Sequence, residues 1–205
     1  MIVSYNLKGI GDTLILVVKD SQGKDVQVER KGDVARVTVV ESGEVVGWNI
    51  FAASHKITNL VGDGQVFLSP SQVTELNLAV KEAGFDEELT VDNSPKFVVG
   101  FVKECQKHED SDHLSVTKII VDNEEELQIV CGAPNIKEGL KVVVAKVGAM
   151  MPDGQMIWPG NLRGVDSFGM ICSAKELHLP NAPEKKGILV LEDDAKVGEK
   201  VEIGK

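Results

Sequence analysis

The stretch LRGVDSFGMICS, at residues 162–173, says more about the fold than any other part of this sequence. Its apolar positions flank two glycines, and the pattern is too interrupted to form a helix. Gly164 and Gly169 therefore predict backbone that turns tightly or lets another segment approach closely, because glycine has no side chain to clash. After Gly169, the run at 170–173 predicts a short buried strand.

A second turn is predicted upstream, in the run CGAPN at residues 131–135. Pro134 restricts the backbone there, and Asn135 tolerates the unusual dihedral angles that tight turns need. The turn comes directly after an apolar run that predicts a strand. The two stretches thus share one arrangement, in which a specific turn lies next to a short apolar strand.

Together the two turns resemble the signature of the tRNA-binding OB-fold domain. This domain occurs in the beta subunit of bacterial phenylalanyl-tRNA synthetase, at the C-terminus of many methionyl-tRNA synthetases and in free-standing tRNA-binding proteins. The resemblance implies a five-stranded Greek-key barrel that binds tRNA, and a homodimer, because free-standing members often pair. It covers five ordered segments: FVVGFVKECQKHEDSDHL at 97–114, LQIVCGAPN at 127–135, KVVVAKVGAMMPDG at 141–154, the stretch at 162–173, and VLEDDAKVGEKV at 190–201.

The rest of the pattern predicts a mainly β chain with two domains. Residues 1–92 contain short alternating runs and glycine-bearing turns, which indicate a β-meander. A helix is expected at about 70–83, with Ser69 as its N-cap and Gly84 at its end, which makes this a small α+β domain. The polar run 86–95 is interpreted as a linker. Residues 93–205 show the strand pattern of a small antiparallel barrel, which the resemblance assigns to the OB fold.

The composition is that of an ordinary globular protein. Of the 205 residues 42% are hydrophobic, and no apolar run approaches the roughly 18 residues of a membrane span. The N-terminus lacks a basic region followed by an apolar core, so no secretion signal is expected. Cys105, Cys131 and Cys172 form no C-x-x-C pair, which is typical of a reducing compartment. We therefore expect a cytoplasmic protein.

The charge argues against nucleic-acid binding at first sight. The chain has 22 basic and 32 acidic residues and a net charge of −10. Both parts are acidic, with 8 basic and 14 acidic residues in 1–95 and 14 and 18 in 96–205. Because neutralisation of phosphates supplies most of the affinity of such proteins, any positive surface must be a local patch.

Residues 108–113, HEDSDH, carry two histidines and three carboxylates. Imidazole and carboxylate are both metal ligands, so a divalent-metal site is one interpretation. The interpretation we favour is a solvated turn between two strands, in which aspartates cap backbone amides. The tRNA-binding family has a His-Pro pair here, and Glu109 stands in place of that proline. We predict no metal and no other cofactor.

The resemblance places Ser167 and Met170 on the tRNA-facing surface, beside Arg163. Arg163 offers a forked donor for phosphate, Ser167 a hydroxyl, and Met170 a flexible apolar surface for an unstacked base. The alternative is that Met170 belongs to the core and that Arg163 pairs with Asp166. Asn135 is either a turn former or a contact to a base edge.

Lysines on the predicted barrel would supply the other phosphate contacts. Lys103 and Lys118 fall on neighbouring predicted strands and Lys146 on a third, so a shared face is expected. Aromatic residues are only 4% of the chain, which disfavours a stacking platform, and Trp158 is the best candidate for an exposed aromatic. The predicted tRNA contacts are Lys103, Lys118, Asn135, Lys146, Arg163, Ser167 and Met170, with Lys107, Lys175, Lys185 and Lys186 as further candidate lysines.

The sequence has none of the common nucleotide-binding or hydrolase motifs, such as G-x-x-x-x-G-K-[ST], G-x-S-x-G or H-E-x-x-H. We therefore predict a protein that is not an enzyme and that binds tRNA through its shape and backbone. The alternative is a protein-interaction module on an aminoacyl-tRNA synthetase or another translation-associated partner, with reduced tRNA affinity. A contiguous positive patch would favour tRNA, and a surface of mixed charge would favour a protein partner.

Overall fold

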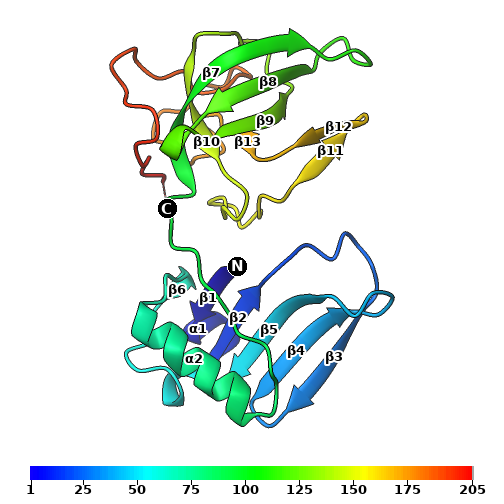
Figure 1. Cartoon of the computed structure of the whole chain (residues 1–205). Helices are drawn as coiled ribbons and strands as arrows, with labels where there is room; N and C mark the ends of the chain where they lie inside the picture. The colour runs from blue at the N-terminus through cyan, green and yellow to red at the C-terminus, as the bar shows by residue number, and fades with distance from the viewer. Residues whose placement is uncertain (205) are drawn as a thin grey trace. The chain divides into compact units, whose positions relative to one another are not determined.

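The computed structural model describes residues 1–204, and β-strands dominate it (Figure 1). Strands make up 35% of the structure and helices 11%, in agreement with the mainly β fold expected from the sequence. The chain divides into two compact units, Met1–Ser94 and Pro95–Lys205. Each unit has its own sheet and its own hydrophobic core. Within residues 1–204, no helix is long and apolar enough to cross a membrane.

The N-terminal unit is built on a six-stranded antiparallel sheet with the strand order β3-β4-β5-β2-β1-β6. Strands β3, β4 and β5 form consecutive hairpins, and β2 pairs with the far side of β5. Its elements are β1 (Ile2–Asn6), α1 (Leu7–Ile10), β2 (Thr13–Val17), β3 (Val26–Lys31), β4 (Val34–Val39), β5 (Val45–Phe51), η1 (Ala53–His55), β6 (Asp63–Gln65) and α2 (Pro70–Glu82).

Helix α2 begins where its sequence signals predict. The Ser69 hydroxyl accepts the backbone N–H of Gln72, and the Gln72 side chain accepts the backbone N–H of Ser69, which is a capping box. Leu76 and Val80 on the buried face join a core in which Trp48 of β5 is 1% exposed. The helix predicted at 70–83 is confirmed, with its end one residue earlier.

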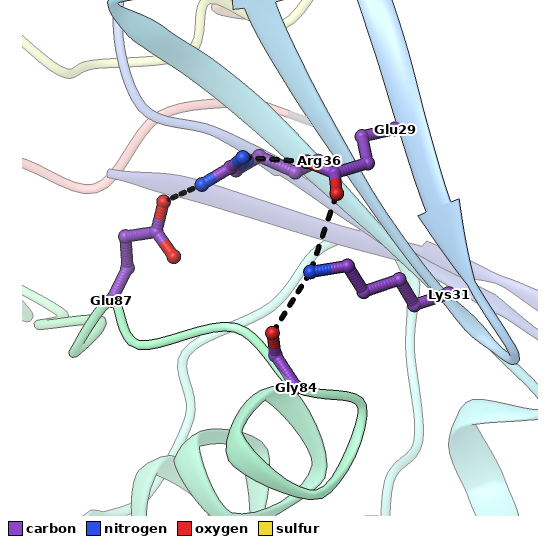
Figure 2. Close-up of polar contacts among 5 residues, drawn as sticks. All are labelled: Glu29, Lys31, Arg36, Gly84 and Glu87. Atoms are coloured by element: carbon purple, nitrogen blue, oxygen red, sulfur yellow. Dashed lines mark hydrogen bonds and ion pairs between the residues drawn. The ribbon is translucent and has the colours of Figure 1, made fainter.

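Polar contacts fasten the chain that follows α2 to the sheet (Figure 2). Lys31 on β3 donates to the carbonyl of Gly84 at 2.9 Å, and it also pairs with Glu29 at 3.2 Å. Arg36 on β4 forms ion pairs with both Glu29 and Glu87. These contacts hold the end of the helix and the segment beyond it against strands β3 and β4.

Apolar packing continues this attachment almost to the end of the unit. Phe85 is 2% exposed, and its ring lies edge-on to Trp48 with 5.1 Å between centroids. Leu89 is 7% exposed in the same core, and the Asn77 side chain bonds both its N–H and its carbonyl. The Asn93 side chain donates to the carbonyl at position 68. The linker prediction for 86–95 is therefore wrong for most of that segment, because it is packed onto the sheet.

The C-terminal unit is a five-stranded antiparallel sheet with the order β13-β10-β7-β8-β9. The sheet curls into a nearly closed barrel of the OB-fold kind, as predicted. Its interior is filled by branched aliphatic side chains such as Val98, Ile119, Ile129 and Val142, all fully buried. Its elements are β7 (Phe97–Lys107), β8 (Ser115–Ile120), η2 (Asp122–Glu124), β9 (Glu126–Cys131), β10 (Lys141–Ala145), β11 (Gly160–Leu162), β12 (Val165–Ser167) and β13 (Met170–Ile171).

The stretch LRGVDSFGMICS spans the remaining opening of the barrel. Its first part, β12, lies beside β9: the N–H of Phe168 donates to the carbonyl of Gln128, and the N–H of Val130 donates to the Ser167 hydroxyl. Two residues later, β13 pairs with β10, with Ile171 opposite Val144. This short stretch therefore contacts β9 at one edge of the sheet and supplies β13, the edge strand at the other side.

Both glycines of this stretch occupy backbone that a side chain would disturb. Gly169 has φ +138°, and a Cβ there would lie 2.8 Å from the carbonyl oxygen of Ala145 on β10. Gly164 has φ +87° and follows Arg163 at φ +50°, so the two form the tight loop of the β11–β12 hairpin. The predicted tight turn and close approach are both confirmed.

Candidate nucleic-acid interface

A groove of about 1000 Å³ lies on the barrel where the two signature turns meet. Its walls come from the CGAPN turn at 131–135, from β13 with the turn that follows it, and from the returning segment 183–190. Most of the lining is apolar, but five charged side chains belong to it. The apolar lining includes Val130, Ala133, Pro134, Met170, Ile171, Ile188, Leu189 and Val190, and the charged residues are Lys175, Glu176, Glu184, Lys185 and Lys186.

Asn135 holds two walls of this groove together. Its Oδ1 accepts the N–H of Ile188 at 2.9 Å, and its Nδ2 donates to the carbonyl of Ile188 at 3.0 Å. Gly187 makes this approach possible, since a Cβ at that position would lie 2.8 Å from Oδ1. Of the two interpretations of Asn135, the structure shows the structural one: the side chain ties the CGAPN turn to the returning chain.

Three exposed lysines of the groove, Lys175, Lys185 and Lys186, form no ion pair within residues 1–204. They come from two segments, one after β13 and one at the start of the returning chain. Glu176 is partly engaged, because one of its carboxylate oxygens accepts the N–H of Ser173 at 2.7 Å. The groove thus gathers cationic side chains that are free to meet a ligand.

Lys103 and Lys118 are neighbours, as expected, but each has a carboxylate partner. Lys103 pairs with Glu126 at 2.7 Å and Lys118 with Glu104 at 3.1 Å. The hydrogen bond from Lys103 lowers the pKa of the Glu126 carboxyl, and the same bond raises the pKa of Lys103. The outer face of β7–β9 therefore carries a balanced cluster of four charges rather than a positive patch.

Lys146 lies outside the charge cluster of Lys103 and Lys118. It follows β10, its side chain is only 12% exposed, and its ammonium lies 2.7 Å from a carboxylate oxygen of Asp122 in the β8–β9 connection. The expectation of one face shared by Lys103, Lys118 and Lys146 is therefore not met, because Lys146 is paired elsewhere.

Arg163 and Ser167 are both engaged with backbone. Arg163 is exposed in the hairpin loop and donates to the carbonyl of Asp110, whereas Asp166 accepts from Asn161 at 2.7 Å. The alternative pairing of Arg163 with Asp166 is therefore wrong. Ser167 is 5% exposed, with its hydroxyl accepting from the backbone of β9, so it serves the closure of the barrel rather than its surface.

Met170 is half-buried: it lines the groove and also packs on the core beneath it. Sequence reasoning passed over Phe168 as an exposed aromatic residue of the barrel. Phe168 lies two positions before Met170, and its side chain is 40% exposed. Trp158, the expected exposed aromatic, is half-buried instead. Alternation along the strand points Phe168 away from the buried Ser167 hydroxyl, but the burial of Ser167 is visible only in the structure.

His108 binds the HEDSDH loop to the β11–β12 hairpin. It is 4% exposed, its Nδ1 accepts the N–H of Asp110 at 3.0 Å, and its Nε2 lies 3.1 Å from the carbonyl of Leu162. A neutral ring with Nε2 protonated satisfies both contacts. The loop is thus a backbone-bonded turn, and within residues 1–204 no group of three or more histidine, cysteine or acidic side chains converges as a metal site.

Comparison with known proteins agrees with the small OB-type barrel. Residues 97–200 match the family described as "Putative tRNA binding domain", and residues 21–92 match a domain of unknown function, DUF4479. The chain belongs to this tRNA-binding domain family. It is 51% identical over 195 residues to the "Putative tRNA-binding protein YtpR" of Bacillus subtilis. This match covers 95% of this chain and 96% of that protein.

The chain is also similar to part of a synthetase. It is 42% identical over 139 residues to the phenylalanine–tRNA ligase beta subunit of Chromobacterium violaceum, and 44% identical over 137 residues to that of Oceanobacillus iheyensis. These matches cover 66% and 62% of this chain but only 18% and 17% of the two ligase subunits. The similarity therefore concerns one small region of a much larger protein.

Proposed function

We propose that this protein binds tRNA, without catalysing a reaction, through the groove between the CGAPN turn and the returning segment 183–190. The observation that carries the proposal is the set of three exposed lysines without an ion-pair partner in the described chain, Lys175, Lys185 and Lys186, on that groove. The match of residues 97–200 to a tRNA-binding family supports tRNA binding by this part of the chain.

Electrostatics favour this groove over the lysines first expected to bind. A paired lysine must give up its carboxylate before it can bind phosphate, whereas an unpaired one only releases water and counterions. Each of the lysines first expected to bind is paired with a carboxylate: Lys103, Lys118 and Lys146. A local set of free lysines on a chain of net charge −10 also predicts binding that weakens steeply as salt is added.

The test is a titration of fluorescently labelled total tRNA, followed by anisotropy at two salt concentrations, with a DNA duplex as competitor. The variant carrying Lys185→Gln and Lys186→Gln should bind roughly tenfold more weakly at low salt. The matched control, Lys103→Gln with Lys118→Gln, removes the same charge from the paired cluster and should change affinity much less. Absence of saturable tRNA binding by the folded wild-type protein at low salt would refute the proposal.

One observation favours a second candidate function. The outer face of β7–β9 presents matched charges, Lys103 with Glu126 and Lys118 with Glu104, and mixed charge of this kind suits a protein partner. A translation-associated protein, such as an aminoacyl-tRNA synthetase, would be such a partner in the cytoplasm. Charge reversal at Glu104 and Glu126 should then weaken binding to that protein and leave tRNA binding intact.

A homodimer is the remaining proposal about assembly, and it rests on the resemblance alone. Sedimentation velocity over a range of protein concentrations would distinguish a dimer from a monomer directly. Repeating the run with tRNA present would show how many chains bind each tRNA.

A further inference from the structure

We propose that the groove holds an unpaired, unstacked segment of RNA and does not bind duplex. The inference rests on the proposed function, and it names the part of the RNA that this site recognises. Three features of the groove carry it: the apolar lining, the commitment of its polar side chains to the protein itself, and the position of its lysines.

The apolar lining is the first feature. Met170 and Val190 contribute surface to the groove, and Val190 is 43% exposed although it is aliphatic. A duplex presents phosphates and sugars and keeps its base faces stacked, so it offers nothing that such a wall can bind. An unpaired nucleotide exposes the flat apolar face of its base. When this face covers the apolar wall, both surfaces leave water and the free energy falls. The volume of about 1000 Å³ is ample for such a segment.

The polar side chains of the groove are largely occupied, which is the second feature. Both functional atoms of the Asn135 amide bond the backbone of Ile188. Ser173 and Glu176 bond each other's backbone N–H groups, at 2.7 and 3.2 Å. Apart from Glu184 and the lysines, few side-chain donors or acceptors therefore remain to read a base edge. Because every base has an apolar face, binding should depend little on base identity.

The lysines are the third feature. Lys185 and Lys186 are adjacent and exposed, three and two residues before the point where Asn135 anchors the chain at Ile188. Asn135 is thus a positioning residue, which places two long cationic side chains beside an apolar wall. A single strand needs this combination, since its backbone must be bound while its bases are covered.

The experiment is a competition against labelled tRNA bound to the wild-type protein. The competitors are single-stranded oligoribonucleotides of about eight residues, within the range that one OB fold covers, as oligo(U), oligo(A) and oligo(C), and an RNA duplex of the same length. We expect the three single strands to displace tRNA at concentrations within about fivefold of each other, and the duplex to need at least about tenfold more. A duplex that competes as well as the single strands would overturn the inference.

Two variants locate the contact. Met170→Gln and Val190→Thr make the wall polar at nearly constant size and charge, and each should weaken single-strand and tRNA binding by roughly threefold to tenfold. Because neither removes a charge, the salt dependence should stay that of the wild type. Val197→Thr, at an exposed valine outside the groove, is the control and should bind normally. Met170 packs on the core, so Met170→Gln can disturb folding. Val190 is exposed, so Val190→Thr should fold normally and tests the contact even in that case.

The outcomes separate the two proposals. If wild-type protein does not bind tRNA, the proposed function fails, and this inference fails with it. If tRNA binds and both groove variants bind as tightly as wild type, only the inference is wrong. In that case the lysines act on phosphates alone.

Discussion

Asn135 and Ile188 are 53 residues apart in sequence, and the amide of the first bonds both backbone polar groups of the second. This pair joins the signature turn at 131–135 to the segment that carries Lys185 and Lys186. It makes the groove a fixed feature of the barrel, because neither wall can move without breaking two hydrogen bonds.

Asn135→Ala should therefore lower both stability and tRNA affinity. Two partly buried backbone groups lose their partner, which costs about 1–3 kcal/mol in the free energy of unfolding. Urea denaturation measures this loss, and anisotropy measures the loss of affinity in the variant that still folds. Gln155→Ala, at an exposed side chain with no hydrogen bond of its own in the described chain, is the control and should leave both quantities unchanged.

Gly169→Ala should destabilise the barrel far more than Gly164→Ala. At Gly169 a Cβ would lie 2.8 Å from the Ala145 carbonyl and 3.2 Å from the Ile129 side chain, in addition to the positive φ. We expect a loss of at least about 2 kcal/mol there. At Gly164 only the positive φ matters, since nothing lies within 4 Å, and the loss should be about 1–2 kcal/mol. Equal thermal unfolding midpoints for the two variants would contradict this account of the closure.

The salt dependence of tRNA binding should report the number of lysines engaged. Each lysine that neutralises a phosphate contributes roughly 0.7–0.9 to the slope of log K against log salt concentration. Substituting Lys175, Lys185 and Lys186 together by glutamine should therefore reduce the slope by about 2–3. An unchanged slope in this triple variant would place the phosphate contacts on other residues.

Asn77→Ala should loosen the segment that follows α2 in the N-terminal unit. The Asn77 amide bonds the N–H of Leu89 at 2.7 Å and its carbonyl at 2.9 Å. Without these bonds, residues 86–93 should open more often, and limited proteolysis should cut there severalfold faster. Glu82→Ala, at an exposed position of the same helix, serves as the control. Rapid cleavage of the wild-type protein at 86–93 would mean that the segment is not held as the structure indicates.

Alkaline pH should destabilise the C-terminal unit through Cys172. Burial raises the pKa of this thiol from about 9.0 to about 12. In the unfolded chain the thiol loses its proton near pH 9.0, whereas the folded protein retains it, so unfolding releases a proton in this range. The contribution of the buried, protonated thiol to the free energy of unfolding is therefore complete below pH 9.0 and is lost as the pH rises towards 12. Urea unfolding at a series of pH values should show a shallower alkaline decline for Cys172→Ala.

The β-strand content, the capped helix and the two signature turns could be predicted from the sequence because each is a local requirement. Gly164 and Gly169 stand where the backbone has positive φ, and Ser69 stands where a helix needs an acceptor. Such requirements act on one residue and its neighbours in sequence, so the residue types at those positions are enough to predict them.

The attachment of residues 86–93 could not be predicted in this way. The segment is polar and ends in a Ser-Pro pair, which is typical of a linker. Its anchors are Leu89, buried with α2, and Arg36, which reaches Glu87 from strand β4. Neither contact is visible in the composition of the segment itself, because both partners lie elsewhere in the sequence.

The sequence alone determined that this chain carries an OB-type barrel with the signature of tRNA-binding domains. Only the tertiary structure decided which lysines are available to a ligand. Lys103 and Lys118 have the same local appearance as Lys185 and Lys186, but the fold brings Glu126 and Glu104 to the first pair and no carboxylate in the described chain into an ion pair with the second. Ion pairing depends on residues that are distant in sequence and close in space, so the binding surface of this acidic protein emerges only when the chain is folded.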